Sequence, residues 1–304
     1  MFIILASTLD PAAVNITEHL RECFGLCPNR EEVLGGKRVL LLPLETEVVS
    51  LSKLPQEAEE ILVASRHASE TGRPSLTVHV PGQLEEGALA MASPCTVKKA
   101  LLALNRLAGE EKLNFQVSLE ATHHGPTHPE VPVTFVEIGG SEEYWRNKKA
   151  GEVVAAAMVE AVGGMSGRLA VGVGGPHYAP RHTEVSLKTD VAIGHILPRY
   201  APLSSQLVEL AVKRTKGKVE LLAADWKGLS SSQREVVKEA SRQLGVELVK
   251  ESELLREFIT GGETGDGARG KEAGADSRRG GSHSSRETHL YRGGAEGDSS
   301  QGPG

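Results

Sequence analysis

The sequence predicts an α/β fold of three layers, with helices on both faces of a mixed, mostly parallel sheet. Short runs rich in Val, Ile and Leu alternate along residues 1–260 with longer stretches of helical periodicity. Strands that alternate with helices are typical of parallel sheets, because each crossover helix returns the chain to the starting edge. The composition, 39% apolar and 24% charged, is that of an ordinary globular chain.

The elements follow from this alternation. Segments with strand character are 2–6, 38–44, 76–80, 115–121, 133–138, 169–173, 191–196, 219–222 and 246–249. Segments with helical periodicity are 11–24, 56–67, 96–108, 142–162, 203–213, 231–244 and 251–258. The pattern contains no internal repeat, and it leaves open whether this body is one domain or two.

Residues 261–304 differ in composition from the preceding body. These 44 residues include 13 Gly, and their large apolar side chains are Leu290 and Tyr291. Such a segment cannot bury enough apolar surface to offset the entropy lost on ordering. We therefore predict an α/β body over 1–260, followed by a disordered tail rich in Gly, Ser and Arg.

Charge and apolar patterning exclude several classes of protein. The net charge of −6 argues against binding of DNA or RNA by bulk electrostatics, although a local basic patch remains open. The longest apolar runs fall far short of the roughly 20 residues that a membrane span needs. Three cysteines do not make a disulfide framework in a chain of this length. We see no secretory signal and expect a cytoplasmic protein with no membrane and no DNA partner.

The first candidate site is the segment Glu120-Ala-Thr-His-His-Gly-Pro-Thr-His128. If the preceding strand continues through it, Glu120 and His124 share the polar face and His123 points toward the apolar face. A carboxylate and imidazoles at a strand end suit zinc, or a general base with its orienting partner. We predict catalytic roles for Glu120, His123 and His124; the alternative is that His123 is a structural core histidine and that His128 is exposed.

The second candidate is Glu137, which lies within an apolar run, Val136-Glu137-Ile138. A buried carboxylate there is costly unless it is paired or bound to metal. We predict that Glu137 is a further catalytic base or ligand. The acidic residues after Ser141 have a structural explanation instead, because they lie at a predicted helix N-terminus.

The third candidate is the glycine-rich turn from Gly172 to His182. Backbone N–H groups of Gly174 and Gly175 are predicted to bind an oxyanion, and Arg181 to bind a phosphate or carboxylate. His177 and His182 flank the turn and are predicted metal ligands. The turn lacks the GxGxxG spacing and the Walker lysine, which disfavours a nucleotide-binding Rossmann site.

Two further strand ends carry histidines. His79 precedes Val80-Pro81-Gly82, and His195 lies in a Gly-His-Ile-Leu-Pro segment that leads to Arg199. We predict substrate binding by His79 and Arg199 and metal binding by His195. Each histidine taken alone is as consistent with a core position as with a site, but together they indicate one rim lined by imidazoles.

In these stretches the chain resembles the archaeal and plant type of D-aminoacyl-tRNA deacylase. The matching segments are Leu-Thr-Val-His-Val-Pro-Gly at 76–82, Leu-Glu-Ala-Thr-His-His-Gly-Pro at 119–126, Phe-Val-Glu-Ile-Gly at 135–139, Gly-Val-Gly-Gly-Pro-His-Tyr-Ala-Pro at 172–180 and Gly-His-Ile-Leu-Pro at 194–198. The Glu-Ala-Thr-His-His-Gly-Pro string is the most specific. Gln83, where asparagine is expected, and Gly140 depart from the pattern, and the tail has no counterpart in it.

The resemblance implies hydrolysis of the ester between a D-amino acid and the 3′-terminal ribose of tRNA, which protects translation from D-amino acids. It also implies a zinc cofactor, with up to two ions per subunit, and a monomer whose fold is similar to peptidyl-tRNA hydrolases and nucleoside phosphorylases. The predicted zinc ligands are His124, His177, His182 and His195, with Glu120 as a further donor.

We expect zinc to assist ester hydrolysis by lowering the pKa of a water. No serine lies in a GxSxG elbow, so an acyl-enzyme is disfavoured. Two other classes remain open: a peptidyl-tRNA hydrolase or metal-dependent amidase, and a metal- or RNA-binding module without activity. No motif encodes how a D-amino acid is distinguished from an L-amino acid.

Overall fold

The structure, a computed structural model, describes residues 1–51, 53–55, 57–68, 72–127 and 130–263. The chain divides into one compact unit over Met1–Thr264 and a second over Gly265–Gly304, and only the first falls within the described residues. The predicted tail over 261–304 therefore lies outside them, except that residues 261–263 continue the last helix. Among the described residues, no helix combines the length and apolar character that a membrane crossing requires.

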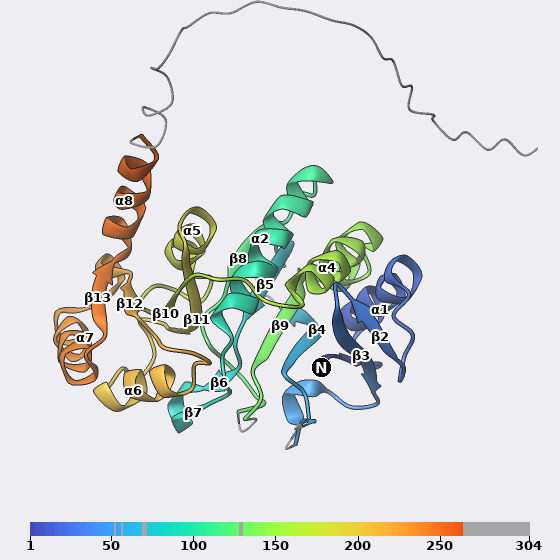
Figure 1. The fold of residues 1–304 in the computed structure, drawn as a ribbon, viewed down its shortest axis with the longest axis horizontal. Coiled ribbons are helices and arrows are strands. Elements are labelled where there is room, and N and C mark those ends of the chain that lie inside the picture. Colours follow the sequence, from blue (N-terminus) through green and yellow to red (C-terminus); the bar gives the residue numbers. More distant parts are fainter. Residues whose placement is uncertain (52, 56, 69–71, 128–129, 264–304) are drawn as a thin grey trace, which may run out of the picture. The chain divides into compact units, whose positions relative to one another are not determined.

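The strands form two main sheets, shown in Figure 1. The seven-stranded sheet has the order β2-β3-β1-β4-β9-β5-β8, with β1 Phe2–Ser7, β2 Glu31–Leu34, β3 Lys37–Leu44, β4 Glu60–Ala68, β5 Ser75–His79, β8 Gln116–Leu119 and β9 Val133–Gly140. The four-stranded sheet has the order β11-β10-β12-β13, with β10 Arg168–Val173, β11 Val191–Leu197, β12 Leu221–Ala224 and β13 Glu247–Lys250. A short ladder joins β6 Gly82–Gln83 to β7 Ala88–Leu89. Only β2–β3 and β5–β9 pair antiparallel in the two main sheets of the described chain, which confirms the mostly parallel α/β prediction.

The helices cover the sheets from two sides. They are α1 Pro11–Phe24, α2 Pro94–Glu110, α3 Glu142–Trp145, α4 Lys148–Ala161, α5 Pro180–Lys188, α6 Ser205–Lys213, α7 Ser231–Leu244 and α8 Glu251–Glu263, with 3₁₀ turns at Val48–Ser50, Leu84–Glu86 and Trp226–Gly228. In Figure 1, α1, α4, α2 and α5 form a row along one side of the sheets, and α6 and α7 lie on the other.

Strand alternation divides the core into three clusters. In β1, Phe2 and Ile4 pack beneath α1, α2 and α4, whereas Ile3 and Leu5 face the opposite side of the seven-stranded sheet. A second cluster lies between the four-stranded sheet and helices α6 and α7. The buried apolar side chains are mainly Leu, Val, Ala and Ile, as the low aromatic content predicts.

The three layers are complete only around the four-stranded sheet. The far face of the seven-stranded sheet is covered by the segment around Val48, Leu54 and Ala58, whose described residues form a 3₁₀ turn and no α-helix. That face is therefore shielded by irregular chain, which leaves room for polar side chains on its strands.

One predicted element is wrong in type. Residues 56–67 were predicted as helix, but Glu60–Ala68 form strand β4 between β1 and β9. Residues 60–64 are buried on both faces of the sheet, so their apolar run does not alternate and periodicity cannot separate strand from helix.

Other differences are local. The predicted helix 142–162 is divided into α3 and α4 because Asn147 caps the second helix by accepting from the Ala150 N–H at 3.0 Å. The short helix α5 and the edge strand β2 were not predicted.

The segment after β8 connects the two sheets. The Ala121 N–H donates to the His177 carbonyl at 2.8 Å, and the Ala179 N–H donates to the Leu119 carbonyl at 3.0 Å. One residue later, the Thr122 N–H donates to the Ile196 carbonyl at 2.9 Å. These bonds hold the chain that follows β8 against the loop that follows β10 and against the end of β11.

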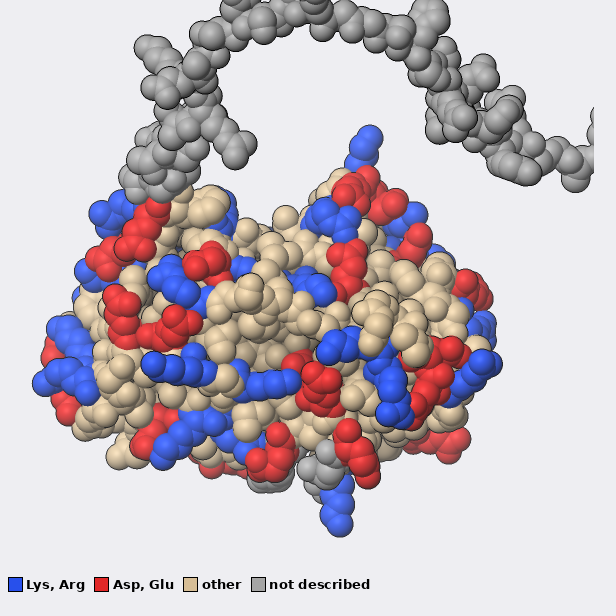
Figure 2. Space-filling model, viewed as in Figure 1, with Lys and Arg blue, Asp and Glu red and all other residues tan. Residues whose placement is uncertain are grey.

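Acidic and basic side chains alternate over the face of the molecule shown in Figure 2, with no broad field of one sign among the described residues there. This distribution agrees with the small negative net charge of −6. The described part of this face therefore presents no broad basic surface to a ligand.

Asn15 links α1 to the α3–α4 junction by hydrogen bonds, and their contribution to stability can be tested. Its buried amide donates to the carbonyls of Trp145 at 3.0 Å and Asn147 at 2.8 Å. We predict that Asn15→Ala lowers the free energy of unfolding by about 1–3 kcal/mol, because two buried carbonyls lose their donor. Urea unfolding measures the change. Asn114→Ala, at an exposed site, should shift it by less than about 0.5 kcal/mol, and equal effects of both variants would refute the role.

Candidate active site

Neighbouring strands place polar side chains on the far face of the seven-stranded sheet. Glu137 of β9 pairs in register with Thr77 of β5, and His79 of β5 pairs with Phe135 of β9. His67 lies near the end of β4, two residues beyond the partner of Glu137. Because side chains alternate along strands, these residues share the face on which Phe135 packs.

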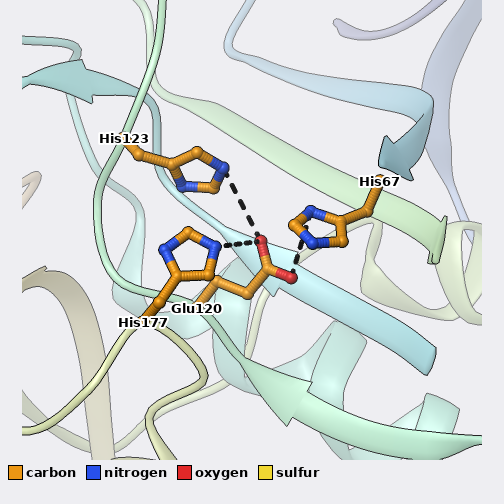
Figure 3. Close-up of side chains that lie close together, drawn as sticks. All are labelled: His67, Glu120, His123 and His177. Atoms are coloured by element: carbon orange, nitrogen blue, oxygen red, sulfur yellow. Dashed lines mark ion pairs between the residues drawn. The ribbon is translucent and has the colours of Figure 1, made fainter. Parts of the chain in front are cut away.

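Glu120, directly after β8, lies at the centre of a group of three histidines (Figure 3). Its Oε1 lies 3.3 Å from His67 Nδ1, and its Oε2 lies 3.7 Å from His123 Nε2 and 3.8 Å from His177 Nε2. The Glu120 side chain is fully buried. The three imidazoles come from β4, from the chain after β8 and from the loop after β10.

Two of these rings are held by tyrosine hydroxyls. His67 Nε2 lies 2.8 Å from the Tyr178 hydroxyl, and His177 Nδ1 lies 3.1 Å from the Tyr200 hydroxyl. In each ring one nitrogen is thereby occupied and the other is directed at Glu120. Metal-binding histidines in proteins have this arrangement, in which an outer partner fixes the ring and its tautomer.

The third ring, His123, is fixed by the backbone. Its Nδ1 must carry the proton, because it lies 2.8 Å from the Ala121 carbonyl, which can only accept. The opposite nitrogen, Nε2, is then an unprotonated acceptor in the neutral ring. That lone pair is directed at the Glu120 carboxyl, which is itself an acceptor when ionised.

A second set of contacts leads to the same carboxyl. His124 Nδ1 donates to the Gly125 carbonyl at 2.7 Å, so His124 Nε2 accepts from His79 Nε2 at 3.1 Å. His79 Nδ1 is then a bare lone pair. It lies 3.6 Å from Glu120 Oε2 and 3.7 Å from Glu137 Oε2.

This geometry brings together more hydrogen-bond acceptors than donors. His79 Nδ1, both carboxyl oxygens of Glu120 and Glu137 Oε2 are buried without a hydrogen-bond partner. Such a set is stable only if protons or a cation lie among its members. Three combinations have ligand atoms within 4.8 Å of one another: His67, Glu120, His123 and His177; His79, Glu120 and Glu137; and His79, His123 and His124. Imidazole nitrogens with a carboxylate oxygen are a donor set that zinc takes, so the residues fit this ion.

Burial sets the protonation of the cluster when no cation is bound. It raises the pKa of Glu120 to about 8, with a further rise from Glu137, and it raises the pKa of Glu137 well above 4.5. Burial lowers the pKa of His123 to about 3 and that of His124 to about 4. At neutral pH these two imidazoles are therefore neutral and able to bind a metal, while Glu120 retains its proton.

A cleft of about 310 Å³ adjoins the cluster. It is lined by residues 82–86, Thr122, His123, His124, Tyr200 and Ala201. His123 and His124 form both part of the cluster and part of the cleft wall. The cleft therefore gives a ligand access to the edge of the cluster.

The family model for D-aminoacyl-tRNA deacylase matches residues 54–249 of the chain. A protein of Pyrococcus furiosus named D-aminoacyl-tRNA deacylase is 36% identical over 273 residues, covering 83% of this chain and all of that protein. The chain belongs to the D-aminoacyl-tRNA deacylase family. A relative of the same name from Archaeoglobus fulgidus is 40% identical over 211 residues, covering 66% of this chain and 75% of the relative. A crystal structure described as a conserved protein of unknown function is 34% identical, with a TM-score of 0.75 over 84% of this chain and 97% of the other.

Most of the predicted catalytic residues of this deacylase-family protein lie together. Glu120, His123, His124 and Glu137 lie in the cluster, as does His79, for which substrate binding was predicted. The predicted direction of His123 is wrong. The strand ends at Leu119 and His124 has a φ of 43°, so alternation stops and both histidines face the site.

Of the predicted metal ligands, His124 and His177 are in the cluster, but His182 and His195 are placed elsewhere. His182, on α5, is fully buried with its Nδ1 3.3 Å from Glu251. His195 donates from Nε2 to the Ala90 carbonyl at 3.1 Å and accepts from the Thr122 hydroxyl at 3.2 Å. Both nitrogens of His195 are occupied, so this geometry gives it a structural role beside the site.

The glycine turn does not offer both predicted amides. The Gly174 N–H donates to the Leu197 carbonyl at 2.8 Å, which corrects its predicted role in binding an oxyanion. Gly175 has a φ of 80°, and its carbonyl accepts from the backbone N–H of Arg199, whose side chain is exposed. The Arg181 side chain pairs with Glu184 at 2.6 Å.

His67 and Tyr178 were missed. His67 ends a Glu-Ile-Leu-Val-Ala-Ser-Arg-His run whose strand character was hidden by the helix prediction. A histidine at the end of an apolar run bounded by Gly72 and Pro74 is the signal that would have found it. Tyr178 had no such signal, because its importance comes only from contact with His67. His128 lies outside the described residues.

The buried carboxyl of Glu120 predicts a pH-dependent stability in metal-free protein. A folded pKa of about 8, against 4.5, contributes stability that is present below pH 4.5 and is lost as pH rises to about 8. We predict that Glu120→Gln, which stays neutral, becomes more stable than the wild type by about 2 kcal/mol at pH 8, and that this gap shrinks toward pH 5.

Urea unfolding in the presence of a chelator at pH 5 and pH 8 measures this gap. Glu45→Gln, at an exposed carboxyl, is the matched control and should give the same difference from wild type at both pH values. A gap for Glu120→Gln that does not change with pH would show that Glu120 is ionised in the folded, metal-free protein.

Proposed function

We propose that this protein hydrolyses the ester bond between a D-amino acid and the 3′-terminal ribose of tRNA, using the histidine–carboxylate cluster and bound zinc. Membership of the deacylase family supports the reaction, and relatives from several archaea carry the name D-aminoacyl-tRNA deacylase. The main support for the site is that three imidazole nitrogens converge on the buried Glu120 carboxyl. The other nitrogen of each ring contacts a tyrosine hydroxyl or a backbone carbonyl.

Zinc would be held by His67, His123 and His177 together with Glu120, and a second ion by His79, Glu120 and Glu137. When bound, the metal supplies a Lewis acid that polarises the ester carbonyl and lowers the pKa of water. The chain prepares this site by keeping the His123 imidazole neutral and by excluding the competing hydrogen bonds of bulk water.

The cleft beside His123 and His124 is the proposed position of the aminoacyl ester. Because His123 and His124 line the cleft, the scissile carbonyl would lie against the cluster while the amino acid and ribose occupy the rest of the cleft. Tyr200, which borders the cleft and contacts His177, would orient the ester against the imidazoles.

With one zinc held by His67, His123, His177 and Glu120 and no ion at the second position, Glu137, ionised beside the bound cation, and His79 would provide a route for a proton. Glu137 can hold the proton that the attacking water loses. His79 can accept at Nδ1 and donate from Nε2 to His124 Nε2, which lies at the cleft wall. The ribose oxygen needs one proton when the ester bond breaks, and His124 would be the group that delivers it.

We further propose that the enzyme works as a cytoplasmic monomer. Aminoacyl-tRNA is present where translation takes place. Every described residue of the cluster comes from one chain, so a second copy is not needed to complete the site.

Release of tyrosine from D- and L-tyrosyl-tRNA tests this function. We expect hydrolysis of D-tyrosyl-tRNA at least about 100-fold faster than of the L form, loss of activity on chelation and recovery with zinc. An N-acetylated L-aminoacyl-tRNA, included to test peptidyl-tRNA hydrolysis, should stay intact. Equal hydrolysis of both enantiomers would contradict the chirality, and full activity after metal removal would contradict the role of zinc.

Matched histidine variants place the activity in the cluster. His67→Gln removes one of the converging nitrogens and should lower kcat/KM by about 100-fold or more. Even the loss of a residue that only hydrogen-bonds to a metal ligand lowers activity or metal affinity by about 10–100-fold. His19→Gln, on α1 and outside the cluster, should remain within about twofold of wild type. Similar activity of both variants would move the site away from His67.

A further inference from the structure

A second cavity, of about 450 Å³, lies at the carboxyl edge of the four-stranded sheet. Its polar and aromatic lining comes from Arg181, Asp225, Trp226, Lys227, Lys250 and Glu251. None of these residues belongs to the histidine–carboxylate cluster or to the cleft beside it. The lining residues follow β12 and β13 and begin α5 and α8.

The topology of this sheet favours ligand binding at that edge. From β10 the chain passes through α5 to β11 on one side, and it then crosses through α6 to β12 on the other side of β10. The loops after β10 and β12 therefore diverge. In parallel α/β sheets such a switch point opens a crevice outside the carboxyl ends of the strands, where ligands bind.

A buried carboxyl in the cavity wall has no hydrogen-bond partner. Glu251 is 1% exposed, and neither of its carboxyl oxygens accepts a hydrogen bond. Its nearest polar neighbour is His182 Nδ1 at 3.3 Å, which is likewise unpartnered. Such a group is costly to bury unless a ligand supplies the missing donor. Burial also raises the pKa of Glu251, to about 8.

The remaining lining residues are complementary to a nucleotide. The half-buried Trp226 indole offers a surface for stacking a base. Lys227, Lys250 and Arg181 can pair with a phosphate, and the carboxyls of Asp225 and Glu251 can accept from ribose hydroxyls or an exocyclic amine. Three cations already lie over the Trp226 ring: Arg234 Cζ is 5.1 Å from its centre, and Lys238 Nζ and Lys250 Nζ are each 5.7 Å from it. A base would therefore stack on the indole by displacing one of these flexible side chains.

The cavity and the active site share one segment of chain. Gly175 packs against Asp225: a methyl group at Gly175 would lie 3.3 Å from Asp225 Oδ2. Two residues later His177 contacts Glu120, and four residues after that Arg181 lines the cavity. Four residues span at most about 14 Å, so the cavity lies within a few nucleotides of the cluster.

We propose that this cavity binds a nucleotide of the single-stranded acceptor end of tRNA, next to the terminal adenosine that carries the amino acid. The inference rests on the proposed function, because it takes the cluster as the position of the ester. It adds a subsite that binds the tRNA part of the substrate and is separate from the groups that hydrolyse the ester bond.

Trp226→Ala tests this subsite through the KM for two substrates. D-tyrosyl-tRNA carries the adjacent nucleotide, and D-tyrosyl-adenosine does not. Loss of the stacking surface should raise the KM for D-tyrosyl-tRNA on the order of tenfold, with kcat changed less than twofold. The KM for D-tyrosyl-adenosine should change less than twofold.

Lys218→Ala is the control variant, a substitution by alanine outside the cavity. Lys218 is exposed and precedes β12, at the opposite edge of the parallel sheet from the cavity, so both KM values should stay within twofold of wild type. An unchanged KM of Trp226→Ala for D-tyrosyl-tRNA, or an equal rise for both substrates, would overturn the proposal.

A binding measurement keeps the proposal testable if no deacylation is found. Trp145→Phe leaves Trp226 as the only tryptophan, since the chain has two. Its fluorescence should be quenched by an uncharged RNA oligonucleotide ending in CCA. Absence of quenching would overturn the subsite. Quenching by free CMP but not by the oligonucleotide would assign the cavity to a free nucleotide and would equally overturn the proposal.

Discussion

The active site depends on one constraint, the convergence of more hydrogen-bond acceptors than donors around a buried volume. The lone pairs of His79 Nδ1 and His123 Nε2 are directed at the carboxyl of Glu120, and their opposite nitrogens are already occupied. Acceptors repel one another in a medium of low polarity unless positive charge lies between them. Either protons on the carboxyls or a divalent cation satisfies the set. The raised pKa of Glu120 belongs to the cation-free protein, and a bound cation would lower it.

The fold produces this convergence by combining both sheets. Strands β4, β5 and β9 place His67, His79 and Glu137 on a face that helices do not cover. The chain after β8 then leaves the sheet and bonds to the loops from the four-stranded sheet, which brings His177 to Glu120. A rigid backbone frame thus holds groups that would separate if either sheet moved.

The sequence predicted the parts of this site that local pattern reveals. Glu120 and Glu137 were found because a carboxylate beside an apolar strand needs a partner, and the adjacent histidines lie at a strand end. The strand–helix alternation also predicted the fold class, except at β4, where burial on both faces removes the alternation that identifies a strand. That error concealed His67. His182 and His195 were predicted as ligands because sequence shows that a histidine lies near a turn but not which partner it meets. Here His182 lies beside Glu251, in α8, and His195 donates to the carbonyl of Ala90, 105 residues away.

Anomalous diffraction at the zinc absorption edge from crystals of the protein grown with zinc tests the central claim most directly. We expect an anomalous-difference peak within bonding distance of His67 Nδ1, His123 Nε2 and His177 Nε2, on the side of the Glu120 carboxyl. A peak at His182 and Glu251 or at His195, with none at the cluster, would contradict it.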